Sequence, residues 1–217
     1  MLSNIFLHHV VDVWFAREVQ PRLRSPSTLI RYCDDFVMLF ACREDAERVL
    51  AVIGKRLGRF GLQLHPDKTR LLDFRPRTST RHEAEAAHDA SFVFLGFLHL
   101  WGKSRKGNWV VRQYTAKDRL SRALQSINEA CRVMRHAPLP EQQLKLSRML
   151  RGHYAYFGIT GNSKQLSRLY HEAKQLWCKW LSRRSWTSYL SWAKFVEKVL
   201  RTFPLPVPKI VHRYTAA

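Results

Sequence analysis

The clearest pattern of apolar and polar positions lies in residues 28–40, where two short apolar runs flank a pair of aspartates. Each run is rich in β-branched and aromatic residues, which favours a strand. Adjacent aspartates favour a turn, because their side chains can hydrogen-bond to the local backbone. The segment therefore predicts a β-hairpin that carries Asp34 and Asp35 at its tip.

Two segments around this hairpin have apolar residues at helical spacing. Residues 2–15 form one stripe, and residues 44–60 form another that ends before Gly61, a residue type common just after helices. Residues 62–64 alternate as in a short strand, so that a helix and a strand return to the hairpin. The predicted buried face of the second helix consists of Ala46, Val49, Leu50, Ile53, Leu57 and Phe60.

Residues 92–101 are almost entirely apolar and predict one buried strand that contains Gly96. A glycine inside a strand allows another backbone to approach closely. The basic segment 102–108 predicts a turn into a further strand at 109–112. Residues 75–90 are rich in Arg, Ser, Thr, His and Ala, which predicts a surface loop without chemistry.

From about residue 116 the pattern is helical throughout, and three apolar stripes predict three packed helices. Pro138 and Pro140 separate the first two helices, and a break at 161–163 separates the second from the third, with Ser163 as the predicted N-cap. The stripes consist of Leu120, Ala123, Leu124, Ile127, Cys131 and Met134, then Leu144, Met149, Leu150, Tyr154 and Phe157, then Leu166, Leu169, Tyr170, Ala173, Trp177, Trp180 and Leu181.

These elements divide the chain into three parts. Residues 1–114 mix strands and helices, residues 115–203 are helical, and residues 204–217 form a Pro-rich tail. The 46% hydrophobic content of the 217 residues supports a packed core. The predicted fold class is therefore α+β, with an antiparallel sheet and flanking helices followed by an all-α part.

Lys and Arg outnumber Asp and Glu by 37 to 17, which gives a formal net charge of +20 at pH 7. Residues 1–100 hold 14 basic and 12 acidic residues, whereas residues 101–217 hold 23 and 5. A long stretch with so few acids indicates a polyanionic partner. An acidic protein or a membrane surface could also attract it, but the sequence has no separate basic amphipathic anchor, so nucleic acid is favoured.

The four cysteines, Cys33, Cys42, Cys131 and Cys178, form no CxxC pair and no Cys/His spacing typical of zinc. They are interpreted as reduced, mostly buried thiols of a cytoplasmic protein. Neither a signal peptide nor an apolar run of transmembrane length is present, so no membrane is expected as a partner. His8 and His9 lack a further ligand in the sequence pattern and are interpreted as structural.

The aspartate pair has two readings. A surface turn is the usual place for Asp-Asp, and such a turn carries no chemistry. A hairpin tip between apolar strands would instead hold two exposed carboxylates close together, and Mg²⁺ takes one or two carboxylates and completes its octahedron with water and substrate phosphates. The apolar flanks favour the second reading, because a solvated turn does not require them.

Residues 31–37, Arg-Tyr-Cys-Asp-Asp-Phe-Val, resemble the Tyr-x-Asp-Asp box of group II intron reverse transcriptase/maturases. Further blocks resemble that family in the correct order, at residues 2–7, 61–69 and 94–97 (Phe-Leu-Gly-Phe). Residues 150–163 and the tail resemble the thumb, or maturase X domain. The resemblance covers nearly the whole chain and implies a partial reverse-transcriptase palm over 1–114, followed by a three-helix thumb.

The resemblance implies RNA-directed DNA polymerisation with Mg²⁺ held by Asp34 and Asp35. It assigns Tyr32, Lys68 and Gly96 to the nucleotide and primer site. Lys68 is a candidate triphosphate contact or proton donor, although as a plain sequence feature it is an ordinary surface lysine. Gly96 allows a neighbouring element or the primer strand to approach.

Basic residues along the second half are the predicted contacts to nucleic acid. The aromatic residues Tyr154, Tyr156 and Phe157 either stack on bases or belong to the helical core. The predicted contacts are Lys103, Arg105, Lys106, Arg151, Lys164, Arg168, Arg183 and Arg184. The expected partners are group II intron RNA, an RNA template with its DNA primer, and dNTPs.

In the family, a third carboxylate and the fingers precede the segment that starts this sequence. We therefore expect an N-terminally truncated fragment with little or no polymerase activity alone, completed by an upstream fragment or a second chain. Asp12 is interpreted as a solvent or capping residue and not as that third carboxylate. A non-catalytic, RNA-binding maturase remnant is the alternative function. Such a partial palm should also expose a sheet edge and an apolar face.

Overall fold

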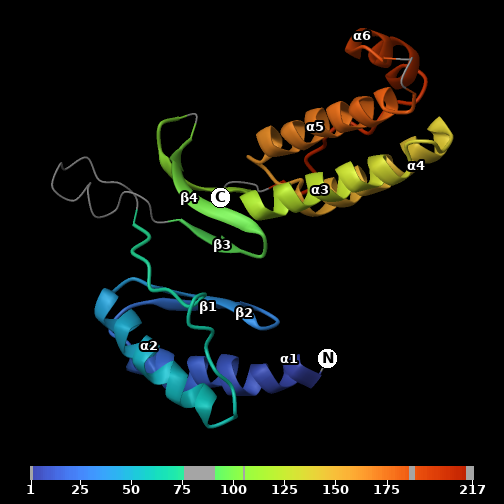
Figure 1. Ribbon diagram of the computed structural model, residues 1–217. Helices are drawn as coiled ribbons and strands as arrows, with labels where there is room; N and C mark the ends of the chain where they lie inside the picture. The colour runs from blue at the N-terminus through green and yellow to red at the C-terminus, as the bar shows by residue number, and fades with distance from the viewer. Residues whose placement is uncertain (1, 76–90, 105, 186–188, 214–217) are drawn as a thin grey trace. The chain divides into compact units, whose positions relative to one another are not determined.

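The computed structural model describes residues 2–75, 91–104, 106–185 and 189–213, and it combines helices with small antiparallel sheets. Two compact units are present. One, here called the N-terminal unit, comprises Met1–Leu95 and Leu100–Val110, and the other, the helical unit, comprises Gly96–His99 and Val111–Ala217. The mixed helix and strand content agrees with the predicted α+β class (Figure 1).

The N-terminal unit begins with one nearly continuous helix, as the apolar stripe of residues 2–15 predicts. It consists of α1 (Leu2–Leu7), two π-type segments, η1 (His8–Val13) and η2 (Phe15–Val19), and a 3₁₀ turn, η3 (Gln20–Arg22). Its apolar side is buried in the unit's core, whose buried members are Val10, Val11, Trp14, Phe15, Val19, Val49, Ile53 and Leu57.

Strands β1 (Ser27–Tyr32) and β2 (Asp35–Phe40) form the predicted hairpin. They pair antiparallel from Ser27 with Phe40 to Tyr32 with Asp35. Because side chains alternate between the two faces, Leu29 and Met38 share the face that packs on the core. The opposite face leaves Ile30, Tyr32 and Leu39 44–64% exposed, as expected for a small sheet with an uncovered apolar face.

Helix α2 (Arg43–Gly58) covers the same core, and Gly61 follows it with a φ of +70°. Two predictions here are wrong. The predicted buried face includes Leu50 and Phe60. These side chains are instead 39% and 41% exposed, because they lie outside the surface that packs on the core. Residues 62–64 are not a strand, since they gain no strand partner, although Leu62 and Leu64 still pack against the core.

The predicted single strand at 92–101 is a hairpin instead. Strands β3 (Phe92–Phe94) and β4 (Phe97–Lys103) are separated by Leu95 and Gly96, whose φ angles are +51° and +78°. Positive φ at two successive residues reverses the chain, which apolar periodicity alone does not reveal. β4 continues through the predicted basic turn into β5 (Trp109–Thr115), so the strand order is β3-β4-β5.

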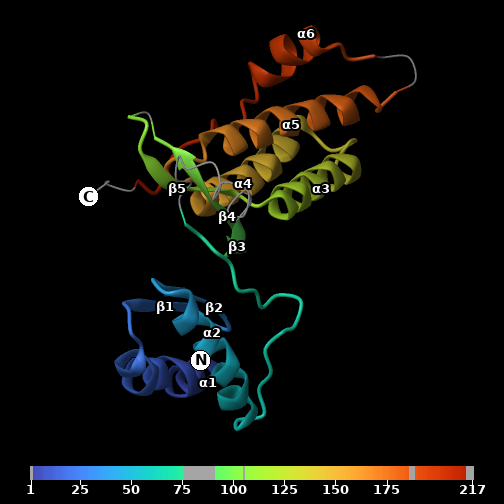
Figure 2. The ribbon, with the colours of Figure 1, turned by 90° about the vertical axis from the view of Figure 1, so that its left-hand side faces the viewer.

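The helical unit contains the three predicted helices, α3 (Lys117–Val133), α4 (Leu139–Phe157) and α5 (Ser163–Ser182), which lie side by side in Figures 1 and 2. Trp177 is fully buried at their centre and donates from Nε1 to Gln142 Oε1 at 2.8 Å. Ser163 is the first residue of α5 and not its N-cap, a position that Asn162 occupies. None of the described helices has both the length and the apolar character needed to cross a membrane.

The buried Asn162 connects the start of α5 to its surroundings. Its side chain accepts from the backbone N–H of Thr115 at 3.0 Å and donates to Thr115 Oγ1 and to the Phe157 carbonyl at 2.8 Å each. These bonds satisfy a polar side chain that is fully buried. An inward hydrogen-bonding role explains why Asn162 precedes the helix without making a side-chain cap bond.

The chain after α5 packs on the three helices. Helix α6 (Trp192–Phe195) continues as η4 (Val196–Leu200), and Phe195 and Val199 enter the core. Further on, Leu205 is buried, and Ile159 forms a parallel bridge with His212. The described part of the predicted tail is therefore attached to the helical unit.

Candidate metal and nucleic-acid sites

The hairpin forms as the sequence predicts, but its turn lies one residue earlier than the aspartate pair, because Asp35 is the first residue of β2. Tyr32 and Asp35 form the last strand pair, and Cys33 and Asp34 make the turn between them. The side chains of Asp34 and Asp35 are exposed, and Tyr32 is 64% exposed beside them. Two neighbouring, water-accessible carboxylates fit the oxygen ligand set of one Mg²⁺, which retains several waters in proteins.

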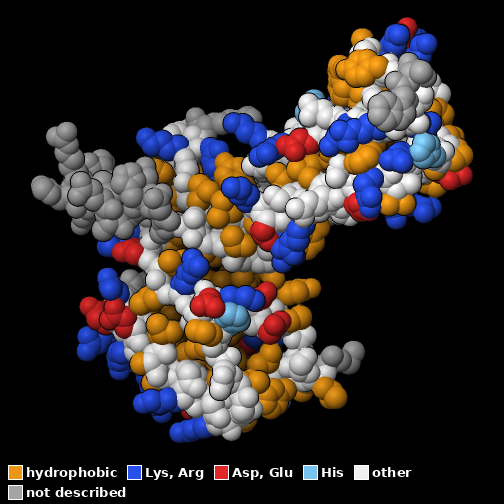
Figure 3. Space-filling model, viewed as in Figure 1, with side chains coloured by type: hydrophobic (Ala, Val, Ile, Leu, Met, Phe, Trp, Pro, Cys, Tyr) orange, Lys and Arg blue, Asp and Glu red, His pale blue; other side chains and the backbone are white. Residues whose placement is uncertain are grey.

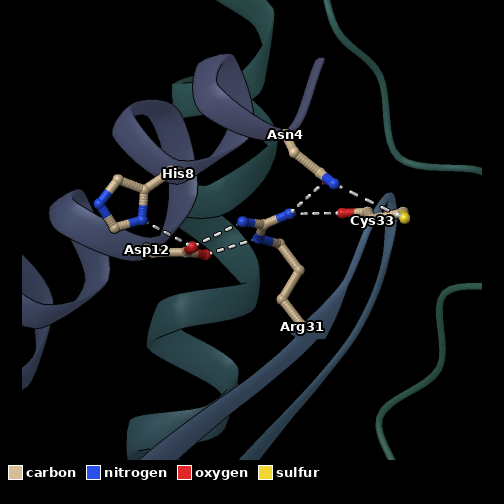
Figure 4. A network of polar contacts seen from close by, with 5 residues as sticks. All are labelled: Asn4, His8, Asp12, Arg31 and Cys33. Atoms are coloured by element: carbon tan, nitrogen blue, oxygen red, sulfur yellow. Dashed lines mark hydrogen bonds and ion pairs between the residues drawn. The ribbon is translucent and has the colours of Figure 1, made fainter. Parts of the chain in front are cut away.

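Behind the turn lies a polar network that sequence reasoning missed (Figure 4). Strand alternation puts Arg31 on the inner face of the hairpin, where its side chain is only 12% exposed. A charge in this position needs a partner. Arg31 Nε and Nη2 donate to Asp12 Oδ1 and Oδ2, each at 2.7 Å. Asp12 is therefore a partly buried ion-pair partner, and its interpretation as a solvent or capping residue is wrong.

The same guanidinium also reaches the turn. Arg31 Nη1 donates to the Cys33 carbonyl at 2.7 Å and to Asn4 Oδ1 at 3.3 Å. His8 Nδ1 lies 3.0 Å from Asp12 Oδ2. The hydrogen bonds from Arg31, with a smaller one from His8, hold the pKa of Asp12 below its usual value despite the opposing effect of burial.

Within the described ranges, no group of three or more His, Cys, Asp or Glu side chains comes together in a way that could hold a metal ion. In the part of the chain that the structure describes, Asp34 and Asp35 are thus not joined by a third side chain of this kind. A His8 and His9 ligand set is not supported, because His8 contacts Asp12 and the two rings pack edge to face at 5.5 Å.

The other residues assigned to the nucleotide site lie in separate elements. Lys68 is exposed in the turn that starts at His65, whose carbonyl accepts from the Lys68 backbone N–H at 3.2 Å. Gly96 is buried, and a Cβ placed on it would lie 3.4 Å from Arg119 Cγ and 3.5 Å from Phe157 Cζ. These are side-chain atoms at ordinary van der Waals distance, so they do not decide between the two predicted alternatives for Gly96.

The predicted contacts of the β4–β5 turn are exposed cations. Lys103 lies over the Trp109 ring at 5.7 Å, and Lys106 is exposed in the turn itself. The turn is shaped by Gly107, whose φ is +83°. Arg105 lies outside the described residues.

In the helical unit the predicted cations fall into two kinds. Arg151 and Lys164 are exposed, and neither has an acidic partner within 4.0 Å in the described chain. The other three already have partners: Arg168 pairs with Glu172 at 2.6 Å, Arg183 lies over the Trp180 ring at 5.2 Å, and Arg184 donates to the carbonyls of Arg135 and Ala137.

Further exposed cations accompany Arg151 on the outer side of α4. Lys145 and Arg148 share that side, and neither forms an ion pair in the described chain. On α3, by contrast, Arg122 pairs with Asp118 and Arg132 pairs with Glu129. Lys and Arg side chains accordingly spread over the surface of the helical unit, with few acids among them (Figure 3).

The three aromatic residues of α4 separate by burial. Tyr154 is 4% exposed and belongs to the core, and Phe157 is half-buried. Tyr156 is 51% exposed and stacks on Phe97 at 5.6 Å with an interplanar angle of 20°. Of the three, Tyr156 is thus the most exposed.

No protein-family model matches this chain, and no curated protein sequence matches it. The resemblance to group II intron reverse transcriptase/maturases consequently rests on the motifs in the sequence itself, and the activity is a proposal.

Proposed function

We propose that this chain binds RNA through its helical unit and binds Mg²⁺ at the Asp34–Asp35 turn, as part of a reverse transcriptase/maturase of the group II intron type. The observation that carries the proposal is the pair of adjacent exposed carboxylates at the tip of the β1–β2 hairpin. The sequence around that pair supports the family, and the charge of the helical unit supports the RNA partner.

In the proposed reaction, which an RNA template directs, the 3′-hydroxyl of a DNA primer attacks the α-phosphorus of a dNTP, loses its proton and displaces pyrophosphate. A bound Mg²⁺ would act as a Lewis acid on phosphate oxygens and would lower the pKa of an attacking hydroxyl. The protein contributes two carboxylates held on a strand-to-strand turn, together with Tyr32, which is exposed next to them. Lys68 is the proposed contact to the triphosphate.

The RNA-binding part of the proposal rests on cations without acidic partners. Lys145, Arg148 and Arg151 of α4 and Lys164 of α5 are exposed and form no ion pair in the described ranges. Such side chains can neutralise phosphates and release condensed counterions, which makes affinity fall with salt. Tyr156 adds an exposed ring on the same helix.

RNA binding is tested with two matched double variants. Arg148→Gln/Arg151→Gln removes two cations that lack acidic partners, whereas Arg122→Gln/Arg132→Gln removes two that are ion-paired. Filter binding to a structured intron RNA at several salt concentrations should show about a tenfold loss for the first variant, and a salt slope smaller by about 1.4 to 1.8. The second variant should change both quantities by less than half as much. Equal effects of the two variants would contradict an interface on α4.

The metal site is tested separately. Asp34→Asn/Asp35→Asn should remove the Mn²⁺ binding that is measured by electron paramagnetic resonance, while RNA affinity stays within about twofold of wild type. Unchanged Mn²⁺ binding in this variant would refute a metal site at the turn.

A non-catalytic RNA-binding protein is the second candidate function. It is favoured by the absence, among the described residues, of a third metal-ligating side chain beside the aspartate pair. Primer extension on an RNA template distinguishes the candidates, and we expect weak extension at most from this chain alone. Robust extension that disappears in Asp34→Asn/Asp35→Asn would establish the polymerase and exclude the non-catalytic candidate.

A further inference from the structure

We propose that Asp12 and Arg31 are positioning residues, which hold the Asp34–Asp35 turn in the conformation that presents its carboxylates. The inference rests on the proposed metal-binding function of that turn. Its structural part concerns the conformation of the turn itself and can be measured without metal.

One guanidinium joins the N-terminal helix to the turn. Two nitrogens of Arg31 bind both oxygens of Asp12 at 2.7 Å, and the third binds the Cys33 carbonyl at 2.7 Å (Figure 4). The planar fork of arginine fixes the directions of these bonds, and a lysine cannot reproduce them. Asp12 therefore orients Arg31, and Arg31 in turn orients a backbone group of the turn.

The Cys33 carbonyl oxygen is the atom through which Arg31 can orient the turn. It belongs to the same planar peptide group as the backbone N–H of Asp34. Fixing that carbonyl fixes the plane from which the Asp34 side chain projects. A hydrogen bond to a strand residue further from the tip would not have this effect.

Cys33 also has an unusual backbone conformation. Its φ is +55°, one of two positive values among the described residues other than glycine. This left-handed region costs a residue with a Cβ roughly 1 kcal/mol or more, and the conformation persists only where its surroundings enforce it. The pairing of Tyr32 with Asp35 closes a two-residue turn around Cys33, and within that turn the Cys33 carbonyl accepts from Arg31, with a weak contact of Asn4 Nδ2 to Cys33 Sγ at 3.9 Å.

The first experiment measures the turn without metal. Residual dipolar couplings are recorded for the backbone of residues 29–38 in wild type, Arg31→Lys and the control Arg43→Lys, which changes an exposed ion pair on α2. In Arg31→Lys the couplings of Cys33 and Asp34 should no longer fit the wild-type turn, while those of Leu29 and Met38 still fit. Couplings at Cys33 and Asp34 that stay at wild-type values would overturn the inference.

The second experiment measures Mn²⁺ affinity by electron paramagnetic resonance. Only the Mn²⁺ binding that is lost in Asp34→Asn/Asp35→Asn is assigned to the turn. Arg31→Lys should weaken this affinity about tenfold, as loss of a residue that orients a metal ligand does elsewhere. Adding Cys33→Gly to Arg31→Lys should restore most of it, because glycine adopts positive φ without strain. Because Cys33→Gly also stabilises the fold by removing strain, urea unfolding of each variant is measured alongside, and an affinity that only follows the folded fraction would refute the positioning role.

The outcomes separate the two proposals. If wild type shows no Mn²⁺ binding that depends on the turn, the proposed metal function fails, and the dipolar couplings alone decide whether Asp12 and Arg31 set the turn. If wild type binds Mn²⁺ and Arg31→Lys binds it equally well, the metal function stands and the positioning role is refuted. Failure of Cys33→Gly to rescue would likewise refute control through the Cys33 carbonyl.

Discussion

The two compact units use charge in different ways. In the N-terminal unit, 17 basic residues accompany 12 acidic ones, and one partly buried pair, Arg31 with Asp12, connects a helix to the turn that carries the candidate metal ligands. In the helical unit, acids are few, and several outward cations of α4 have no acidic partner in the described residues. Charge joins a helix to a hairpin turn in the first unit, whereas in the second it lies on exposed side chains, several of which have no acidic partner among the described residues.

The hydrophobic cores of the two units also differ. The N-terminal core lies between a two-stranded hairpin and two helices, and it leaves Ile30, Tyr32 and Leu39 exposed on the other side of the hairpin. The helical core is organised around the fully buried Trp177 and extends to Phe195 and Leu205. We therefore expect core truncation in the helical unit to have the largest effect on stability.

Trp177→Ala should lower the free energy of unfolding of the helical unit by about 4 kcal/mol, because it leaves a large cavity and removes the partner of Gln142. Urea unfolding followed by circular dichroism measures the change. Trp192→Ala, at a position that is 45% exposed, is the control and should cost about 1 kcal/mol. A cost of Trp177→Ala as small as that of the control would contradict a core centred on this ring.

Asp12→Asn should destabilise the N-terminal unit by about 2 to 3 kcal/mol at pH 7, because Arg31 would remain 12% exposed without its carboxylate. The pKa of Asp12 lies below 3.8 in the folded unit, so this stabilisation is present above the unfolded value and is lost as the pH falls through the folded one. Hydrogen exchange of hairpin amides at pH 7 compares the variant with wild type. Arg43→Lys, in an exposed pair, should change exchange little.

Local patterns predicted most of the fold, and contacts between distant residues were the part that could not be predicted. The hairpin and the three long helices follow from apolar spacing. Turn preference locates the hairpin turn only to within one residue, because Asp35 belongs to β2 and the turn consists of Cys33 and Asp34. The Asp12–Arg31 pair joins residues 19 apart, which no local pattern encodes. Strand alternation could have indicated it, since alternation places Arg31 beside the inward Leu29 on one face.

Some predicted nucleic-acid contacts show the same limit of prediction from local sequence patterns. The sequence predicts Arg184 as an outward cation, but in the structure it donates to the carbonyls of Arg135 and Ala137 and so joins the segment after α5 to the connection between α3 and α4. Arg151 and Lys164 have the same residue character and remain exposed. The sequence alone does not distinguish a cation that is hydrogen-bonded within the fold from one that remains exposed to a ligand.

His153 should make the helical unit lose stability at a higher pH than the N-terminal unit. Burial lowers the pKa of His153 to about 4 from an ordinary 6.5. Its Nε2 atom is buried without a hydrogen-bond partner in the described chain. The unfolded chain therefore takes up the proton first, so stability is complete above about pH 6.5 and falls as the pH drops toward 4. We expect a loss of about 2 kcal/mol after allowance for partial exposure.

Urea unfolding of the helical unit at pH 7 and pH 5 measures this loss, and His153→Phe should flatten the profile, because phenylalanine keeps the ring packing on Phe157 without a titrating nitrogen. In the same pH interval the Asp12–Arg31 pair should not change, since its titration lies lower. Parallel losses in both units between pH 6.5 and 5 would contradict the assignment to His153.

The smallest expected changes in stability come from substitutions of glycines. Comparing these substitutions distinguishes the cost of backbone strain from the cost of tight packing. Gly96 and Gly107 have φ angles of +78° and +83°, but Gly96 is buried in the helical unit, and Gly107 is exposed in the other. A Cβ at Gly96 would meet its nearest atom at 3.4 Å, an ordinary contact distance, and a Cβ at Gly107 would meet none within 4 Å. Each Gly→Ala change should therefore cost the same, about 1 kcal/mol, from the left-handed backbone alone.

Gly54→Ala is the matched control for these two substitutions. It lies inside α2 with open space around its Cβ position, so it should stabilise by up to about 1 kcal/mol, because alanine favours the helix. Urea unfolding monitored with hydrogen exchange assigns each change to its unit. A cost at Gly96 several times that at Gly107 would mean that packing against Arg119 and Phe157, and not backbone strain, requires glycine between β3 and β4.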